Sequence, residues 1–317
     1  MKTFTSDIVR HVFPGMRFNV EGKIELEQNF RINCINAFGD NINNKKDFDI
    51  LLSKKIGHPV CAPIYIENIK KNDSIEIYIK DISINHVMQS ISKSTGFLDS
   101  SNMDRNFKLI SNKNDLLQFN NISLLAKPTV GFLSVIPDKK FSCGRASKYG
   151  GNLDINFLRK ASKIRLPIFV DGAGLMVGDL HALQGNGEGC GIAMEASGKI
   201  ELEIRKSKKT SFPIIETDDK IVIVGTGDTL EELFKDATRN ALKFVTYSFG
   251  FSILEDSYMF VSAVGNYGLG NATGNVKTGY ISFSKCILLS LKSNYRIYDE
   301  NNLNENEIEL FNMIKDI

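Results

Sequence analysis

Apolar side chains recur at every second position in three well-separated segments of the chain. Residues 30–35 and 199–205 alternate apolar and polar side chains, and residues 74–84 carry isoleucines at alternate positions with one phase slip near Asp81. This period of two is typical of a β-strand with one buried face. The slip predicts a β-bulge, because one inserted residue moves the following side chains to the other face.

The order of the predicted elements indicates the fold class. Most predicted strands precede Glu195, and the regular strand–helix alternation of a doubly wound fold is missing. We therefore predict a β-rich α+β fold, with a β-sandwich or barrel-like N-terminal portion and a smaller α/β portion carrying two packing helices. The predicted domains are residues 1–195, which would carry the functional site, and residues 196–317, with helices near 229–249 and 254–264.

The first of these helices has clear start and stop signals. Asp228 or Thr229 is expected to be its N-cap, with Glu231 or Glu232 closing a capping box. Gly250 is a typical C-terminal stop. Its apolar positions share one face, which predicts packing onto a sheet. They are Leu230, Leu233, Phe234, Ala237, Ala241, Phe244 and Val245.

The composition excludes several functional classes. Hydrophobic residues make up 42% and charged residues 24% of the 317 residues, as in an ordinary soluble globular protein. The formal net charge of +2 is too small to predict binding to nucleic acid or to an anionic membrane surface. No apolar run reaches the roughly 18 residues that span a bilayer, and the N-terminus lacks a signal-peptide core, so we expect a cytoplasmic protein. The five cysteines form no Cys-x-x-Cys pair.

Candidate functional residues gather in one glycine-rich segment, residues 166–195. Asp179, His181, Gln184 and Glu188 lie among four glycines, and Glu195 follows on the next apolar run. Asp179 and His181 are two positions apart, so on a strand both side chains would leave the same face. Carboxylates and an imidazole on one surface can bind a divalent metal or act as an acid/base pair. The alternative is that the glycines mark tight turns and the acids are turn or cap residues.

A second polar pair lies upstream of this segment. Asn152 and Asp154, again two positions apart, follow Gly150-Gly151. Their amide and carboxylate could face the Asp179/His181 pair. The alternative is that Asp154 caps a short helix, and both can hold at once.

These segments carry a family resemblance. Residues 178–188, Gly-Asp-Leu-His-Ala-Leu-Gln-Gly-Asn-Gly-Glu, with Glu195 seven residues later, resemble the signature of the acetamidase/formamidase family. Gly150-Gly-Asn-Leu-Asp154 is similar to that family's Gly-Gly-Asn-Met-Asp. Residues 57–66 and 128–137 resemble two proline-containing segments of the family, so the resemblance spans most of the chain.

The resemblance implies metal-dependent hydrolysis of small aliphatic amides of the formamide or acetamide type, giving a carboxylate and ammonia. It implies zinc or calcium as the metal, and we expect zinc in preference to calcium; the mixed nitrogen and oxygen ligands are compatible with either. It also implies a homodimer. The sequence contains no Gly-x-Ser-x-Gly elbow and no evident Ser-Lys arrangement that would indicate a side-chain nucleophile. This favours water activated by a metal as the nucleophile.

The roles implied for the individual residues are as follows. Asp179 and His181 are the expected metal ligands, and Asn152 and Asp154 are the next candidates. Glu195 would be a ligand or a supporting carboxylate. The last two residues act on the substrate: we expect Glu188 as the general base and Gln184 as the group that orients the amide.

Two other readings of the chain remain open. It could be a non-catalytic relative in which a metal only ties loops together, or an amidohydrolase for a larger amide. In the latter case residues 89–127, a polar stretch rich in loop signals, could shape the pocket or form a lid. Two departures from the family pattern, Asn186 and Asn266 in place of the usual Asp, could signal a different substrate.

Overall fold

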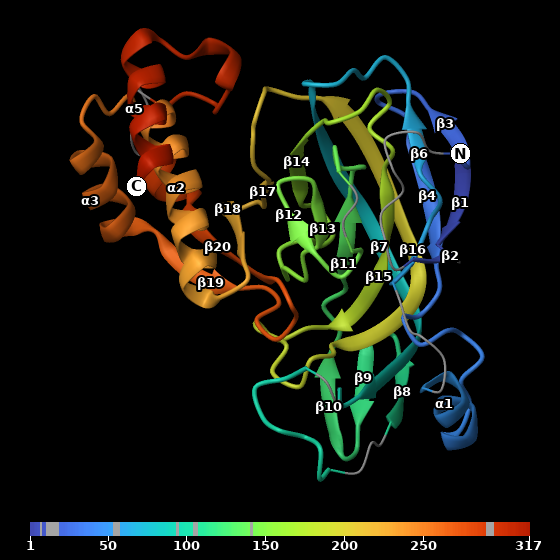
Figure 1. The fold of residues 1–317 in the computed structure, drawn as a ribbon. Coiled ribbons are helices and arrows are strands. Elements are labelled where there is room, and N and C mark those ends of the chain that lie inside the picture. Colours follow the sequence, from blue (N-terminus) through green and yellow to red (C-terminus); the bar gives the residue numbers. More distant parts are fainter. Residues whose placement is uncertain are drawn as a thin grey trace.

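The computed structural model describes residues 1–6, 8–10, 19–52, 58–92, 95–103, 107–139, 142–289 and 295–317. Strands hold 41% of the residues and helices 19%, which confirms the predicted β-rich α+β class. Figure 1 shows a large curled sheet with most of the helical residues grouped on one side. Within the described ranges, no helix combines the length and the apolar composition that crossing a membrane requires.

Strands follow one another along most of the chain, and the longest helix comes late. The strands are β1 (Lys2–Ser6), β2 (Ile8–Arg10), β3 (Gly22–Ile24), β4 (Asn29–Cys34), β5 (His58–Val60), β6 (Ile64–Ile66), β7 (Ser74–Ser90), β8 (Phe107–Lys113), β9 (Leu116–Phe119), β10 (Ile122–Leu125), β11 (Thr129–Ser134), β12 (Ala146–Ser147), β13 (Gly150–Asn152), β14 (Lys163–Pro167), β15 (Met176–Leu183), β16 (Met194–Lys206), β17 (Ile214–Glu216), β18 (Lys220–Gly227), β19 (Asn266–Leu269) and β20 (Lys277–Ser284). The helices are α1 (Lys45–Leu52), α2 (Leu230–Phe249), α3 (Leu254–Val264), α4 (Lys285–Leu289), the 3₁₀ turn Glu300–Asn302 and α5 (Glu305–Asp316).

Two long antiparallel strands, β7 and β16, run through the middle of the sheet (Figure 1). Their register shifts where Glu201 pairs with Asp81 but Leu202 pairs with Ile79. This irregularity confirms the bulge predicted near Asp81. The isoleucines that alternate along β7 are buried in the main core, because their face of the strand points away from solvent.

A second, smaller core lies between the strands β18 and β20 and the helices α2, α3 and α5. Glycines allow the close approach of α2 to β18. An ideal Cβ on Gly225 would lie 2.4 Å from the amide nitrogen of Ala237, and one on Gly227 would lie 2.2 Å from that of Leu233. Any larger side chain at these two positions would push the helix off the strand. Figure 1 shows α2, α3 and α5 together on the outer side of these strands.

The N-terminus of α2 is held by a complete capping box. The N-cap is Thr229, whose hydroxyl accepts from the Glu232 amide, and the Glu232 carboxylate accepts from the Thr229 amide. This is one of the pairings that the sequence allowed. The helix ends at Gly250, which has the left-handed φ of 69° expected of a C-terminal glycine.

We expect Thr229→Ala to lower the free energy of unfolding by about 1 kcal/mol, because the first turn of α2 loses its side-chain acceptor. Urea denaturation followed by circular dichroism measures this change. Ser252→Ala, at an exposed position between α2 and α3, is the control and should leave the midpoint unchanged. Equal midpoints for both variants would contradict a stabilising cap.

Residues 89–127 form strands as well as loops. After β7 the chain builds the antiparallel strands β8, β9 and β10, which extend from one end of the sheet (Figure 1). Ahead of them, the amide of Phe97 donates to the Gly189 carbonyl (2.9 Å) and that of Ser92 to the Cys190 carbonyl (3.1 Å). The described part of this excursion therefore contacts the loop that follows Glu188. A role as a lid stays a prediction.

Candidate active site

Neighbouring strands bring the predicted residues together. β13, β11, β15 and β16 are successive neighbours in the sheet, and His181 on β15 lies directly opposite Glu195 on β16. Asp179 precedes His181 by two residues, and Asp154 lies just after β13. The Nε2 of His181 lies 3.5 Å from Glu195 Oε2, 3.7 Å from Asp179 Oδ1 and 3.9 Å from Asp154 Oδ1. Three carboxylates from three parts of the chain therefore surround one imidazole.

Three of the site carboxylates sit on backbone in the left-handed region. The φ angles are 48° for Asp154, 60° for Asp179 and 46° for Glu188. Such angles are uncommon outside glycine, less so for Asp than for Glu, and cost on the order of 1–3 kcal/mol each. The surrounding sheet and loops must hold these residues in place. Strained backbone that gathers at one cluster of acids is a typical property of a functional site.

The site is buried and rich in acids. The relative exposure of its residues runs from 1% for His181 to 8% for Glu188, so the charges are withdrawn from water. Burial raises the pKa of Glu188 to about 8, with repulsion from Asp154 adding to it. Burial also raises the pKa of Glu195 well above its usual range. Burial lowers the pKa of His181, but the charges of Glu195, Asp179 and Asp154 outweigh this effect and raise it well above its usual value.

The cluster matches the requirements of a divalent cation. Two sets of side chains each offer ligand atoms within 4.8 Å of one another: Asp154, His181 and Glu188, and Asp179, His181 and Glu195. Ligand atoms on a tetrahedral ion with bonds of about 2.0–2.1 Å lie about 3.3–3.4 Å apart, close to the separations around His181 Nε2. Among the described residues, the buried Oε2 of Glu195 has no hydrogen-bond partner. A cation would satisfy this oxygen and offset the repulsion between the acids.

Space for such an ion is left by a glycine on the middle strand. Gly131 on β11 lies between the site residues, and an ideal Cβ there would be 2.6 Å from Asp154 Oδ1, 2.6 Å from His181 Cε1 and 2.9 Å from Asp179 Oδ2. Any side chain at this position would enter the gap between these three residues. The glycine therefore belongs to the site although it offers no ligand.

Glu188 stands beside the cluster, held by two amides. Gln184 Nε2 donates to Glu188 Oε1 (3.1 Å), and Asn271 Nδ2 donates to Glu188 Oε2 (3.0 Å). The same two amides also bind Asp154: Gln184 donates to its main-chain carbonyl (2.7 Å) and Asn271 to its Oδ2 (2.9 Å). Asp154 and Glu188 are thus fixed relative to each other by a shared pair of donors.

Of the three other asparagines named in the sequence analysis, one lies beside the cluster and two are exposed. Asn152 lies next to the cluster and donates from Nδ2 to Asp154 Oδ2 (2.6 Å). Asn186 is exposed, and its amide donates to the Tyr280 hydroxyl (3.3 Å). Asn266 is also exposed and donates to the carbonyl of Val264 (3.4 Å). Among the described residues, neither Asn186 nor Asn266 forms a hydrogen bond with the carboxylates of the cluster.

Two residues of the site were missed in the sequence. Gly131 lies within residues 128–137, a segment that resembles the family pattern, so a signal for it was present. Asn271 lies in a glycine-rich stretch after Gly265 and had no distinguishing neighbour in the sequence. It reaches the site because the loop around it pairs with the signature loop, through a bridge between Gly187 and Asn271.

Known proteins share this segment and this fold. A model of the Acetamidase/Formamidase family matches residues 139–214. This segment contains the histidine and all the carboxylates of the cluster, whereas Gly131 and Asn271 lie outside it. A formamidase of Methylophilus methylotrophus is 43% identical over 58 residues, which are 18% of this chain. That alignment spans only 14% of the formamidase's own length.

Two crystal structures match over almost the whole chain. An acetamidase from Yersinia enterocolitica has a TM-score of 0.81 at 26% identity, covering 90% of this chain and 92% of its own. An acetamidase from Bacillus halodurans has a TM-score of 0.83 at 22% identity, covering 91% of this chain and 99% of its own, which shows a common fold. The family model over residues 139–214 and the shared architecture therefore both relate this chain to the acetamidase/formamidase family.

Proposed function

We propose that this protein hydrolyses small aliphatic amides of the formamide or acetamide type to a carboxylate and ammonia, with the help of a divalent metal. The observation that carries the proposal is the buried cluster of Asp154, Asp179, His181 and Glu195 with Glu188 beside it. The relatives named formamidase and acetamidase support the same reaction. Amide hydrolysis needs a nucleophile, a group that polarises the carbonyl and an acid for the leaving nitrogen, and this cluster can supply all three.

His181, Asp179, Asp154 and Glu195 are the residues that would hold the metal. Their ligand atoms converge, their burial excludes competing water, and their combined charge favours a cation. A divalent ion there would supply Lewis acidity, which lowers the pKa of water and polarises an amide carbonyl. The nitrogen and oxygen donors suit zinc, which we propose, and do not exclude calcium.

Glu188 is the residue that we propose moves the proton. In the balanced reaction water adds to the carbonyl carbon and the new C–O bond replaces the C–N bond. One proton of the water passes to the departing nitrogen, and the other is released when the carboxylic acid ionises. Glu188 takes the first of these protons and returns it, as a general base and then a general acid. Two amides hold its carboxylate in a fixed orientation, with one donor to each oxygen.

Gln184 and Asn271 are proposed to position that carboxylate. The Nε2 group of Gln184 already donates to the Asp154 carbonyl and to Glu188. The predicted role of Gln184 in orienting the amide substrate would use its Oε1. Among the described residues, this oxygen accepts a single long hydrogen bond of 3.5 Å, from Thr129 Oγ1. Three further expectations stay predictions: that residues 1–195 form a separate domain carrying the site, that the protein is cytoplasmic, and that it is a homodimer.

The experiment that tests the proposal is ammonia release from formamide and acetamide by protein as purified, after chelation and after the return of zinc. We expect activity to fall with the metal content and to recover with it, because the cluster depends on the ion for its Lewis acidity. The control is the same chelator loaded with zinc beforehand. Activity that survives proven removal of the ion would rule out the metal-dependent mechanism. Protein that loses thermal stability on chelation but releases no ammonia in any state would indicate an ion that only ties loops together.

A further inference from the structure

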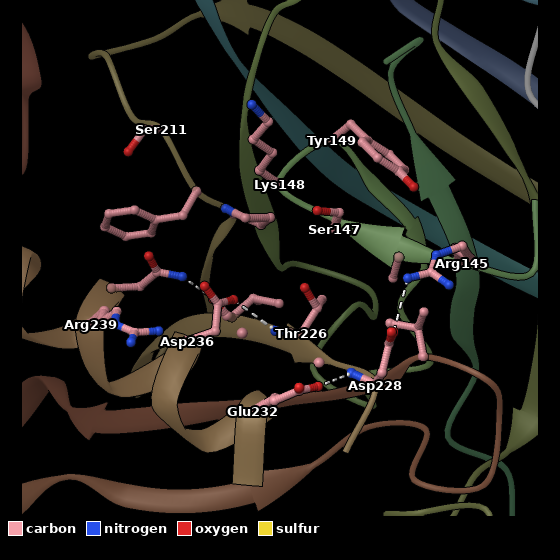
Figure 2. A pocket seen from close by; sticks show the side chains of 18 of the residues that line it. Arg145, Ser147, Lys148, Tyr149, Ser211, Thr226, Asp228, Glu232, Asp236 and Arg239 are labelled. Atoms are coloured by element: carbon pink, nitrogen blue, oxygen red, sulfur yellow. Dashed lines mark hydrogen bonds and ion pairs between the residues drawn. The ribbon is translucent and has the colours of Figure 1, made fainter. Parts of the chain in front are cut away.

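A cavity that does not include the acidic cluster lies between the sheet and α2. Its volume is about 690 Å³, and Figure 2 shows walls from the β12 region, the end of β18 and α2. Residues 211–213 and Lys315 of α5 complete the lining. Its lining, as far as the described residues go, includes none of the residues assigned to the candidate active site. Pockets that bind organic ligands span about 300–1,000 Å³, so this one is large enough for a small molecule.

The acidic side chains that line this cavity already have partners within the protein. Asp228 pairs with Arg145 (2.9 Å), as Figure 2 shows. Glu232 accepts from the amides of Asp228 and Thr229 at the start of α2. Asp236 accepts from the Thr226 amide (2.9 Å), which ties α2 to β18. These three carboxylates therefore hold the cavity wall together.

Three cations of the lining have no carboxylate partner among the described residues, although Lys315 Nζ donates to Asn312 Oδ1 (3.1 Å). Arg239 and Lys243 occupy successive turns of α2, and Lys315 joins them from α5. Within the part of the chain that the structure describes, no carboxylate oxygen lies within 4 Å of their side-chain nitrogens. The buried Nε of Arg239 has no hydrogen-bond partner among the described residues either.

These positive charges act on one another. Burial lowers the pKa of Lys243, and the charges of Lys315 and Arg239 lower it further, whereas Glu300 and Asp236 oppose the shift. Like charges four residues apart on a helix destabilise it, and a half-buried ammonium without a counter-ion costs free energy. An anion placed between the three would offset both costs.

We propose that this cavity binds a small organic anion, whose phosphate or carboxylate group is held by Arg239, Lys243 and Lys315. The guanidinium of Arg239 can bind such a group with two parallel hydrogen bonds, and the two lysines add compact positive charge. The remaining wall suits an organic body. It offers apolar contacts from Phe212, Pro213 and Val276 and hydroxyl groups from Ser147, Ser211 and Thr226.

Isothermal titration calorimetry with inorganic phosphate and, separately, with succinate tests this proposal at constant ionic strength. We expect saturable binding of at least one probe to the wild-type protein. Lys243→Gln and Lys315→Gln should each weaken it about tenfold, the usual contribution of one charge-assisted hydrogen bond. Binding of phosphate alone would assign a phosphate ligand, and binding of succinate alone would assign a carboxylate.

The matched control is Lys235→Gln, which removes an exposed lysine of the same helix that pairs with Glu231 and does not line the cavity. Its affinity for either probe should equal that of the wild type. Because Lys315 is exposed, its variant will fold even if Lys243→Gln does not. The proposal is overturned if neither probe binds saturably, or if the control weakens binding as much as the cavity variants do.

Discussion

Glu188→Gln is expected to slow ammonia release from formamide and acetamide by about a hundredfold to ten-thousandfold, the usual contribution of a general base. The substitution keeps the size of the side chain and the acceptor for one of its two amide donors, Gln184 or Asn271. It removes the negative charge and the ability to take up a proton, and it replaces the other acceptor oxygen by an NH2 group. We therefore expect the metal content and the melting temperature to stay close to those of the wild type, while the rate of turnover falls.

Glu201→Gln is the matched control for this experiment. Glu201 lies on β16, the strand of Glu195, and pairs at the partly exposed surface with Arg31. Its replacement should leave turnover unchanged, because partly exposed ion pairs contribute little. A Glu188→Gln variant that keeps full activity would exclude Glu188 as the base and direct attention to another carboxylate of the cluster. A variant that loses its metal as well would indicate that Glu188 is a ligand.

Gly131→Ala is expected to weaken metal binding by about ten- to a hundredfold and to lower turnover with it. The added methyl group would lie within 3 Å of Asp154, Asp179 and His181 at once. The atoms that it meets are the ends of side chains, so the ligands must shift while the backbone of β11 can stay in place. Displacing the ligands or their supports typically costs this much affinity. Competition with a chromogenic chelator and elemental analysis of the purified protein measure the change.

Gly185→Ala is the control for the glycine, because an ideal Cβ there meets no atom within 4 Å. It lies in the signature loop itself, three residues before Glu188, and should leave metal binding unaltered. Equal affinity in both variants would contradict the placement of the ion in the gap beside Gly131. Loss of folding in Gly131→Ala, detected by circular dichroism, would instead show that β11 depends on the glycine for its own packing.

The sequence predicted the local elements well because they depend on local chemistry. The period of two along residues 74–84 requires a half-buried strand, and its phase slip requires a bulge, which the structure has beside Asp81. Thr229 and Glu232 are three residues apart, so the capping box needs no distant partner. The β-rich class follows from the number of such strands and the absence of a regular strand–helix order.

The members of the candidate site were predicted for a related reason. Asp179 and His181 are spaced for one face of a strand, and the glycine-rich loop with Glu188 and Glu195 follows directly. For Asp154, the spacing indicated only that its carboxylate could face the Asp179/His181 pair, and the family resemblance supported this. Nothing in the spacing shows that β11 separates β13 from β15, and the sheet order decides this.

By itself, the sequence determined which segments become strands, where α2 begins and ends, and which acids and which histidine are available for a metal. The tertiary structure alone decided how far apart these groups lie, that Gly131 leaves room between them, and that Asn271 holds Glu188. It also decided that Arg239 and Lys243 meet Lys315 in a cavity, although the sequence only predicts an amphipathic helix there. The reason is physical. Period and capping act within a few residues, whereas a site depends on strand pairing and helix docking between segments that are distant along the chain.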